Sequence, residues 1–526
     1  MASDTGSTST PPPGAGTTST SAASLVARQD RIPIWSLSYL FIGIIGIGFL
    51  FTFYDIFDIT VSFIQTCTQI VDKCVPGGPP GSVLAADKLG LPVELNLAGY
   101  VIGALILSPL ADRFGRRDML LFTLLLTGLG SLYTAFVNDY TNFIIARVIT
   151  GIGIGADLAI VNTYINEVAP RNSRAKYTSL IFIMSALGAF VGIWLGLWLT
   201  TPPGDFPYGL SFAQAVPQTI NGIATPFGGS GWRIMYGIGA VLALVGILLR
   251  FQLPESPRWL ISRGRVEDAD KIVAGMEERA RKRVSDLPAP ADELPVQAGS
   301  TKVPYSEILT NPLYLRRTLF LVVVWFLGYI TIYAIAQGLT TLLAAVLPLP
   351  AGLPPPEAEG AVAGEAGMLA ALGTFGFIAS AIFAYYFGEK LERKFWLPIS
   401  AVLTVIGALL MGIFTSSNFT LAAIGAIVTF FGFNLWVPMT YTWTTEHYPT
   451  RARATGFALG DSLGHLGGGV GILLLAGNIP SLLDSLGKDS GPTVILMLIC
   501  IGLVLAAIVA LFGTATRQKR LDEVSP

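Results

Sequence analysis

Long apolar runs separated by short polar stretches recur along the whole chain. A helix needs about 20 apolar residues to cross the hydrocarbon core of a bilayer, and each run reaches or approaches that length. The runs lie at residues 36–63, 93–111, 119–138, 141–166, 177–200, 232–252, 316–345, 367–388, 396–415, 419–443, 453–477 and 492–513. This pattern predicts twelve transmembrane helices.

Basic residues gather in every second loop between these runs. They precede the first run and follow the second, fourth, sixth, eighth, tenth and twelfth, whereas the other loops carry few Lys or Arg. Loops rich in Lys and Arg stay on the cytoplasmic side of a membrane. We therefore expect both termini in the cytoplasm, an even number of spans, and a multi-pass protein of the plasma (inner) membrane.

The composition agrees with a chain embedded in a lipid bilayer. Hydrophobic residues make up 52% of the 526 residues and charged residues only 13%, too few to cover a soluble protein of this length. The formal net charge of -1 gives no reason to expect a nucleic-acid partner. Residues 1–32 begin with a stretch rich in Ser, Thr, Pro and Gly that has no apolar signal segment, and we expect them to form a disordered cytoplasmic tail.

A charged motif occurs twice. Glu167-x-x-Pro-x-x-x-Arg174 ends the fourth run, and Glu446-x-x-Pro-x-x-x-Arg453 ends the tenth, at an offset of 446 − 167 = 279 residues. The charged loops after the second and eighth runs resemble each other more weakly, since each has an acidic residue followed by several basic ones. This repeat predicts two parallel six-helix halves, and carriers built in this way hold their solute between the halves near the bilayer midplane.

The repeat also predicts the domain boundaries. We place the N-terminal half at 33–252 and the C-terminal half at 316–515. A cytoplasmic linker at 253–315 joins them and contains a surface helix near Val266–Arg283, and residues 516–526 form a cytoplasmic tail.

Three motifs resemble the major facilitator superfamily. They are Pro109-Leu-Ala-Asp112-Arg113-Phe-Gly115-Arg116-Arg117, Pro254-Glu255-Ser-Pro257-Arg258-Trp259-Leu260 and Glu446-His-Tyr-Pro449-Thr450-Arg451-Ala-Arg453. Each stands at its expected helix end, and the likeness covers essentially all twelve spans, closest to the sugar porter and metabolite:proton symporter (organic-ion, phosphate) branches. The resemblance implies an all-α major facilitator fold and transport by alternating access.

Several departures from the usual motifs narrow the choice of branch within the superfamily. Sugar porters usually carry Gln-Gln-x-x-Gly-x-Asn in span seven, where this chain reads Val324-Trp-Phe-Leu-Gly-Tyr-Ile-Thr-Ile-Tyr333, so a hexose is disfavoured. The Gly-Pro element of drug antiporters is missing from span five. Asp157 in span four is similar to the Asp of phosphate and metabolite:proton symporters, but its neighbours differ from the Gly-Asp-Tyr-Pro context and weaken the case for phosphate.

A charge at the centre of a membrane helix costs about 2.5–3.5 kcal/mol, so ionisable residues within the runs are candidates for proton coupling or substrate binding. They are Asp55, Asp58, Arg147, Asp157, Asp461 and His465. For each, the alternative is a structural hydrogen bond, an ion pair between helices, or a hydrated position at the interface.

Their spacing suggests roles. Asp55 and Asp58 share one helix face and could bind and release a proton, as a symporter needs. Arg147 resembles the span-four arginine that the superfamily links to proton transfer. Asp461 and His465 also share a face, and His465 stands where organic-ion carriers often have Asp or Arg, which leaves the charge of the solute open.

Aromatic residues could stack on a planar or cationic solute, although packing and interface belts use such rings as well. The cavity candidates are Tyr329, Tyr333, Trp436, Tyr441 and Trp443. Acid–base pairs at the cytoplasmic helix ends could latch the two halves, as the resemblance implies. The gate candidates are Asp112, Arg113, Arg116, Arg117, Glu167, Arg174, Glu255, Arg258, Glu446 and Arg453.

These patterns predict a secondary active transporter, not an enzyme, that works as a monomer and carries a small polar organic metabolite with a proton. A carboxylate or related organic ion is favoured, and no cofactor or metal is expected. A sugar or phosphate symporter, a uniporter, an exchanger and a non-transporting nutrient receptor are the alternatives. Cys67 and Cys74, beyond the first run, either form a disulfide or remain free thiols.

Overall fold

The computed structural model describes residues 21–75, 83–200, 230–284, 286–290, 304–347, 355–486 and 491–525, with 205–206, 210–211, 219–220, 223–224 and 352. Eleven segments within this described part are long and apolar enough to cross a membrane. The remaining expected span, at residues 453–477, coincides with a further long helix, α17 (Arg453–Leu486), which is not among these eleven. The count of twelve spans therefore stays a prediction.

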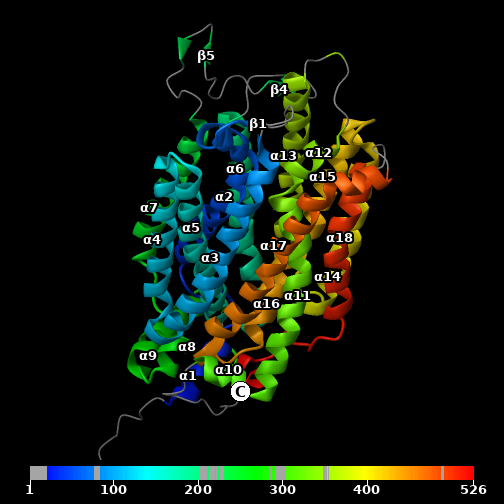
Figure 1. Cartoon of the computed structure of the whole chain (residues 1–526). Coiled ribbons are helices and arrows are strands. Elements are labelled where there is room, and N and C mark those ends of the chain that lie inside the picture. Colours follow the sequence, from blue (N-terminus) through cyan, green and yellow to red (C-terminus); the bar gives the residue numbers. More distant parts are fainter. Residues whose placement is uncertain are drawn as a thin grey trace, which may run out of the picture.

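Two bundles of long helices stand side by side (Figure 1). The N-terminal bundle contains α2 (Tyr39–Ile70), α3 (Ala85–Phe114), α4 (Arg116–Phe136), α5 (Tyr140–Val168), α6 (Arg174–Thr200) and α7 (Gly231–Arg250). The C-terminal bundle contains α11 (Pro312–Ala336), α12 (Leu339–Val346), α13 (Pro355–Phe387), α14 (Trp396–Phe414), α15 (Phe419–Leu435), α16 (Val437–Glu446), α17 (Arg453–Leu486) and α18 (Gly491–Ala510). Across the interface, α3 packs on α17 and α6 packs on α13.

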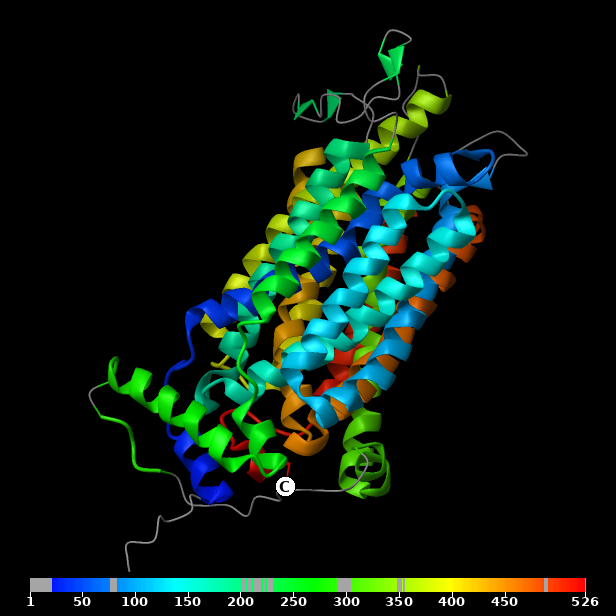
Figure 2. The same ribbon diagram turned by 90° about the vertical axis from the view of Figure 1, so that its left-hand side faces the viewer.

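Short helices cover one end of both bundles (Figures 1 and 2). They are α1 (Ala22–Asp30), α8 (Pro257–Ser262), α9 (Val266–Arg281), α10 (Pro304–Thr310), α19 (Leu521–Val524) and the 3-10 turns at Arg171–Ser173, Arg393–Phe395 and Thr450–Ala452. The C-terminus lies at the same end. We call it the basic end, because the charged loops that the sequence assigns to the cytoplasm lie there.

Residues 22–30 are ordered, in contrast to the disordered tail expected for residues 1–32. The Ser21 hydroxyl accepts a hydrogen bond from the Ser24 backbone N–H and caps α1. Leu25 and Val26 are buried against Trp259 and Val273, so this short segment gains an apolar contact that its composition did not reveal. Residues 1–20 lie outside the described part of the chain.

Two predicted spans are broken helices. Span seven divides into α11 and α12 at Gln337 and Gly338, and span ten divides into α15 and α16 near Trp436. Pro438 stands in the first turn of α16, where its missing N–H costs no helix hydrogen bond. Both breaks lie beside the space between the two bundles.

A glycine is required where α3 turns into α4. Gly115 has a φ of 121°, which side chains rarely tolerate, and a Cβ there would lie 2.3 Å from Glu255 Oε2. The Gly of the Asp112–Arg117 motif therefore permits the tight turn that brings Arg116 next to Glu255.

The opposite end carries short two-residue strands and a disulfide. Cys67, near the end of α2, is bonded to Cys74 of strand β1 (Cys74–Val75), with a Cα–Cα distance of 5.8 Å. Strand β1 pairs with β2 (Val83–Leu84), which leads into α3. Of the two alternatives for these cysteines, the structure contains the disulfide.

Candidate functional site

A small cavity lies between the two bundles. Its volume is about 50 Å³, and its lining residues come from both halves. They are Phe53, Ile56, Phe57, Leu158, Tyr329, Ile332, Tyr333, Ala336, Phe377, Phe433, Asn434, Val437, Tyr441 and His465. Most are apolar or aromatic, and none of them carries a permanent charge.

Hydrogen bonds close the cavity toward the end opposite the basic one. The Thr60 hydroxyl donates to the Ala336 carbonyl at 3.0 Å, and the Gln337 amide donates to the Ile56 carbonyl at 3.1 Å. Both bonds join α2 to the break between α11 and α12. A cavity of about 50 Å³ has room for only a few water molecules in this arrangement of the halves.

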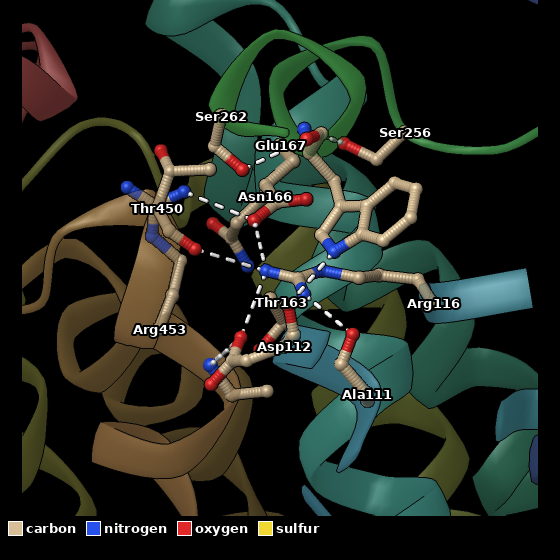
Figure 3. A network of polar contacts seen from close by, with 12 residues as sticks. Ala111, Asp112, Arg116, Thr163, Asn166, Glu167, Ser256, Ser262, Thr450 and Arg453 are labelled. Atoms are coloured by element: carbon tan, nitrogen blue, oxygen red, sulfur yellow. Dashed lines mark hydrogen bonds and ion pairs between the residues drawn. The ribbon is translucent and has the colours of Figure 1, made fainter. Parts of the chain in front are cut away.

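A buried cluster closes the basic end on one side (Figure 3). Arg116 lies 2.9 Å from Asp112 and 3.0 Å from Glu167, and Arg453 of the other half lies 3.3 Å from the same Glu167 oxygen. Arg116 also donates to the Thr450 carbonyl across the interface at 3.0 Å. All four charged side chains are fully buried, so the cluster ties the halves together away from bulk solvent.

A second cluster, built from the repeated positions, closes the other side. Arg393 lies 3.0 Å from Glu389 and 3.5 Å from Glu446, and Arg174 of the N-terminal half lies 3.7 Å from Glu446. In each cluster a glutamate thus stands between an arginine of its own half and an arginine of the other half. The offset of 279 residues relates Glu167 to Glu446 as well as Arg174 to Arg453.

The acids of the two clusters also cap helices of the opposite half. The backbone N–H groups of Ala454 and Thr455, at the start of α17, donate to the Asp112 carboxylate at 3.3 and 2.9 Å. The N–H of Ala175, at the start of α6, donates to Glu389 Oε1 at 2.7 Å. A helix N-terminus favours negative charge, so these contacts add to the ion pairs that join the halves.

Four gate candidates do not join the two long bundles in their described contacts. Glu255 accepts hydrogen bonds from the backbone N–H groups of Arg116 and Arg117 and so braces the start of α4. Arg258 pairs with Asp30 of α1. Arg117 donates to the Phe251 carbonyl, and the exposed Arg113 lies over the Phe114 ring. Their described contacts thus join the short helices α1 and α8 to each other or stay within the N-terminal half and its linker.

Asp55 forms a buried ion pair inside the N-terminal half. Arg147 lies 2.9 Å from Asp55 Oδ2, and the Ser131 hydroxyl donates to Oδ1 of the same carboxylate. Asp58 lies near Arg147 and the Tyr236 hydroxyl and has no hydrogen bond of normal geometry among the described residues. Because Ile56 and Phe57 line the cavity, the carboxylate of Asp55 faces away from it, toward α4 and α5.

Asp157 lies in a separate buried pair. Arg250 contacts both of its oxygens, at 2.5 and 3.0 Å, and the Thr123 hydroxyl donates to it at 2.8 Å. These partners are on α7 and α4. Asp157 is therefore not brought together with Arg147, although only ten residues separate them on α5.

Asp461 and His465 lie next to the cavity on α17. Asp461 accepts hydrogen bonds from the Tyr329 hydroxyl at 2.6 Å and from the Tyr100 hydroxyl at 2.5 Å. The His465 ring lies between Tyr100 and Tyr329, with centroid distances of 3.7 and 3.9 Å. Of the aromatic candidates, Tyr329, Tyr333 and Tyr441 line the cavity, while Trp436 packs against Trp325 and Trp443 donates to the Thr514 carbonyl.

The family follows from comparison with known proteins. A sequence profile described as sugar (and other) transporter matches residues 41–347, more than half of the chain, and one described as Major Facilitator Superfamily matches residues 353–525. The chain belongs to the major facilitator superfamily. This superfamily consists of membrane transporters for small molecules and not of enzymes.

Relatives within the superfamily carry several kinds of solute. The niacin transporter NiaP of Acinetobacter baylyi is 26% identical over 513 residues, covering 95% of this chain and 99% of NiaP. The 4-hydroxybenzoate transporter PcaK of the same organism is 27% identical, covering 74% of this chain and 78% of PcaK. The structure of the proton:xylose symporter XylE superposes with a TM-score of 0.64 at 20% identity, covering 92% of this chain and 98% of XylE, and supports the fold.

The sequence did not single out several residues of the site. Arg250 ends the sixth apolar run and could have been recognised as an ionisable residue at a span boundary. Arg393 belongs to the charged loop after run eight, but the sequence assigned it no partner. Tyr100 and Phe377 carried no signal, because aromatic residues are common in membrane helices and only the packing shows which ones face the interface.

Proposed function

We propose that this member of the superfamily is a proton-coupled symporter of a small aromatic carboxylate. It would act in the plasma membrane, with its basic end in the cytoplasm. The observation that carries the proposal is the closed cavity between the halves, whose walls are mainly aromatic and aliphatic. Planar rings pack well against such walls through stacked and edge-to-face contacts.

The polarity of the cavity favours a carboxylic acid over a sugar. Only Tyr329, Tyr333, Asn434, Tyr441 and His465 offer polar groups among the lining residues. A sugar would leave several of its hydroxyl groups without a partner, which is costly in a closed site. An aromatic acid instead presents one apolar ring and one polar group. The names of NiaP and PcaK, which refer to niacin and 4-hydroxybenzoate, are consistent with this class.

Proton coupling follows from the charge of such a solute. No Lys or Arg is among the described lining residues, so a carboxylate would be buried without a permanent counter-charge. Burying an unpaired ion is strongly unfavourable, and a proton taken up with the solute removes the net charge. Asp55 lies on the face of α2 that points away from the cavity, where it pairs with Arg147. Its carboxylate could carry this proton.

Reconstituted protein tests the proposal. Proteoliposomes with an alkaline interior should accumulate labelled nicotinate or 4-hydroxybenzoate but not xylose, and the lumen should acidify as the solute enters. Accumulation of xylose alone would contradict the aromatic class. Equilibration without a pH response would indicate a uniporter or exchanger, and binding without uptake would indicate a receptor.

A further inference from the structure

Tyr100 connects the two halves at the depth of the cavity. It belongs to α3 of the N-terminal half, and its hydroxyl donates to Asp461 Oδ2 of α17 in the C-terminal half at 2.5 Å. Its ring also stacks on His465, with a centroid distance of 3.7 Å and an interplanar angle of 23°. A hydrogen bond and a ring stack therefore cross the interface through one side chain.

Asp461 receives one hydrogen bond from each half. Tyr329 of α11, in the same half as Asp461, donates to Oδ1 at 2.6 Å, and its oxygen lies 3.1 Å from the Tyr441 hydroxyl. Asp461 is fully buried. The bond from Tyr100 is thus the one that must break when α3 and α17 separate, whereas the bond from Tyr329 moves with the C-terminal half.

Asp55 differs from Asp461 in that its described partners all belong to one half. The described partners of Asp55 are Arg147 and Ser131, which both belong to the N-terminal half. Protonation of Asp55 therefore changes contacts within one half, whereas protonation of Asp461 changes a contact between the halves.

We propose that Tyr100 is a positioning residue that makes separation of the halves depend on protonation of Asp461. The inference rests on the proposed proton-coupled transport. A hydrogen bond to an ionised carboxylate is roughly twice as strong as one between neutral groups. Ionised Asp461 therefore holds Tyr100 and keeps the halves together, and protonated Asp461 holds it more weakly and raises the population of open conformations.

Other titratable groups surround this pair. The phenols of Tyr329 and Tyr333 on α11 and of Tyr441 on α16 face Asp461. His465 on α17 lies 3.6 Å from the carboxylate. Further along α3, Glu94 lies against Gly469 of α17. Of these groups, His465 is the basic side chain next to the carboxylate, so the test must separate it from Asp461.

Double electron–electron resonance between two spin labels measures the distance between the halves in the absence of solute. One label pair replaces the exposed Lys271 and Lys390 at the basic end, and a second replaces the exposed Thr141 and Ser417 at the other end. The substitution Tyr100→Phe removes the bond between the halves and keeps the ring. Tyr329→Phe is the matched control, because it removes a bond to the same carboxylate that stays within one half.

In the parent protein, lowering the pH from about 7.5 to 5.5 should shift the distances of at least one pair toward longer values. Tyr100→Phe should show the acid distribution already at the higher pH and lose at least half of the pH-dependent shift. Tyr329→Phe and His465→Gln should keep the shift, and Asp461→Asn should show the acid distribution throughout. Thermal unfolding, measured separately, tests whether each variant is folded, and nicotinate exchange by the parent protein tests whether the proposed solute is correct.

Two results would overturn the proposal. One is a Tyr100→Phe variant with the same pH response as the parent or as Tyr329→Phe. The other is loss of the response in His465→Gln but not in Asp461→Asn. If instead the distances behave as expected and no aromatic acid is transported, the proposed solute is wrong while the role of Tyr100 stands.

Discussion

Glu167 of the N-terminal half lies 3.3 Å from Arg453 of the C-terminal half, and Arg116 lies 3.0 Å from the same carboxylate oxygen. The glutamate therefore pairs with two buried guanidinium groups that belong to different halves. Its removal should weaken the closed basic end more than the loss of any acid that contacts one half only.

The substitution Glu167→Gln should open the basic end. Breaking a buried ion pair costs about 3–5 kcal/mol, and the part of this cost that comes from the lost contact with Arg453 falls on the closed state alone. A cysteine at the buried position Ser108, near the basic end of α3, should react with a maleimide at least 10-fold faster in this variant. Glu255→Gln is the control, because in its described contacts Glu255 accepts bonds only from N–H groups of the N-terminal half and of the adjoining linker, and from none of the C-terminal half. Equal acceleration in both variants would contradict the assignment of the gate.

The pair formed by Asp157 and Arg250 should support the fold more than the coupling. Asp157→Asn or Arg250→Met alone should lower thermal stability strongly, since each leaves a buried partner without its counter-charge. The double variant should recover part of the loss, with a coupling energy of about 1–3 kcal/mol in a double-mutant cycle. Proton-driven uptake by the double variant would agree with a structural role, and loss of uptake with normal stability would support a role in coupling.

Filling the cavity should weaken binding of the solute. Phe377 is buried at the cavity wall, whereas Phe383 lies on the same helix and is 36% exposed on its outer face. Phe377→Trp should weaken nicotinate binding at least 10-fold, or about 1.4 kcal/mol, and Phe383→Trp should not. A thermal-shift titration measures both. Unchanged binding by Phe377→Trp would place the solute elsewhere.

Docking of α1 should depend on pH through Glu277. Partial burial raises the pKa of Glu277, but hydrogen bonds from Arg28 and Arg31 outweigh this effect and hold the pKa below its usual value. Because the folded pKa is depressed, the stabilisation is present above the unfolded pKa of about 4.3 and is lost as the pH falls through the folded pKa. Hydrogen exchange of residues 22–30, corrected for its intrinsic rate, should therefore increase at pH 3.5.

A substitution distinguishes the loss of the Glu277 contacts from a general destabilisation of the protein at low pH. Glu277→Gln should increase exchange of residues 22–30 already at neutral pH, because Arg31 loses its carboxylate partner and Arg28 keeps only Asp270. Glu278→Gln is the matched control, since Glu278 is exposed and pairs with Lys282 of the same segment. If both variants exchange alike, the contacts with Glu277 do not hold α1.

Much of the fold could be predicted from the sequence because it depends on properties that are local in the chain. Apolar length located the spans, and the motif shared by Glu167 and Glu446 revealed the two halves. The same motif placed Glu167, Arg174, Glu446 and Arg453 at helix ends, and in the structure these residues pair with one another across the two halves. The contacts between the halves could not be predicted, because partners such as Tyr100 and Asp461 are 361 residues apart. Their pairing depends on helix rotation and tilt, which hydrophobic periodicity does not determine.

The direct test of coupled transport compares two measurements on Asp55→Asn. The variant should exchange internal for external nicotinate at a rate within a few-fold of the parent protein, because the cavity is unchanged. It should fail to accumulate nicotinate under an imposed pH gradient, because the side chain paired with Arg147 no longer binds a proton. Accumulation by the variant equal to that of the parent protein would contradict proton coupling through Asp55.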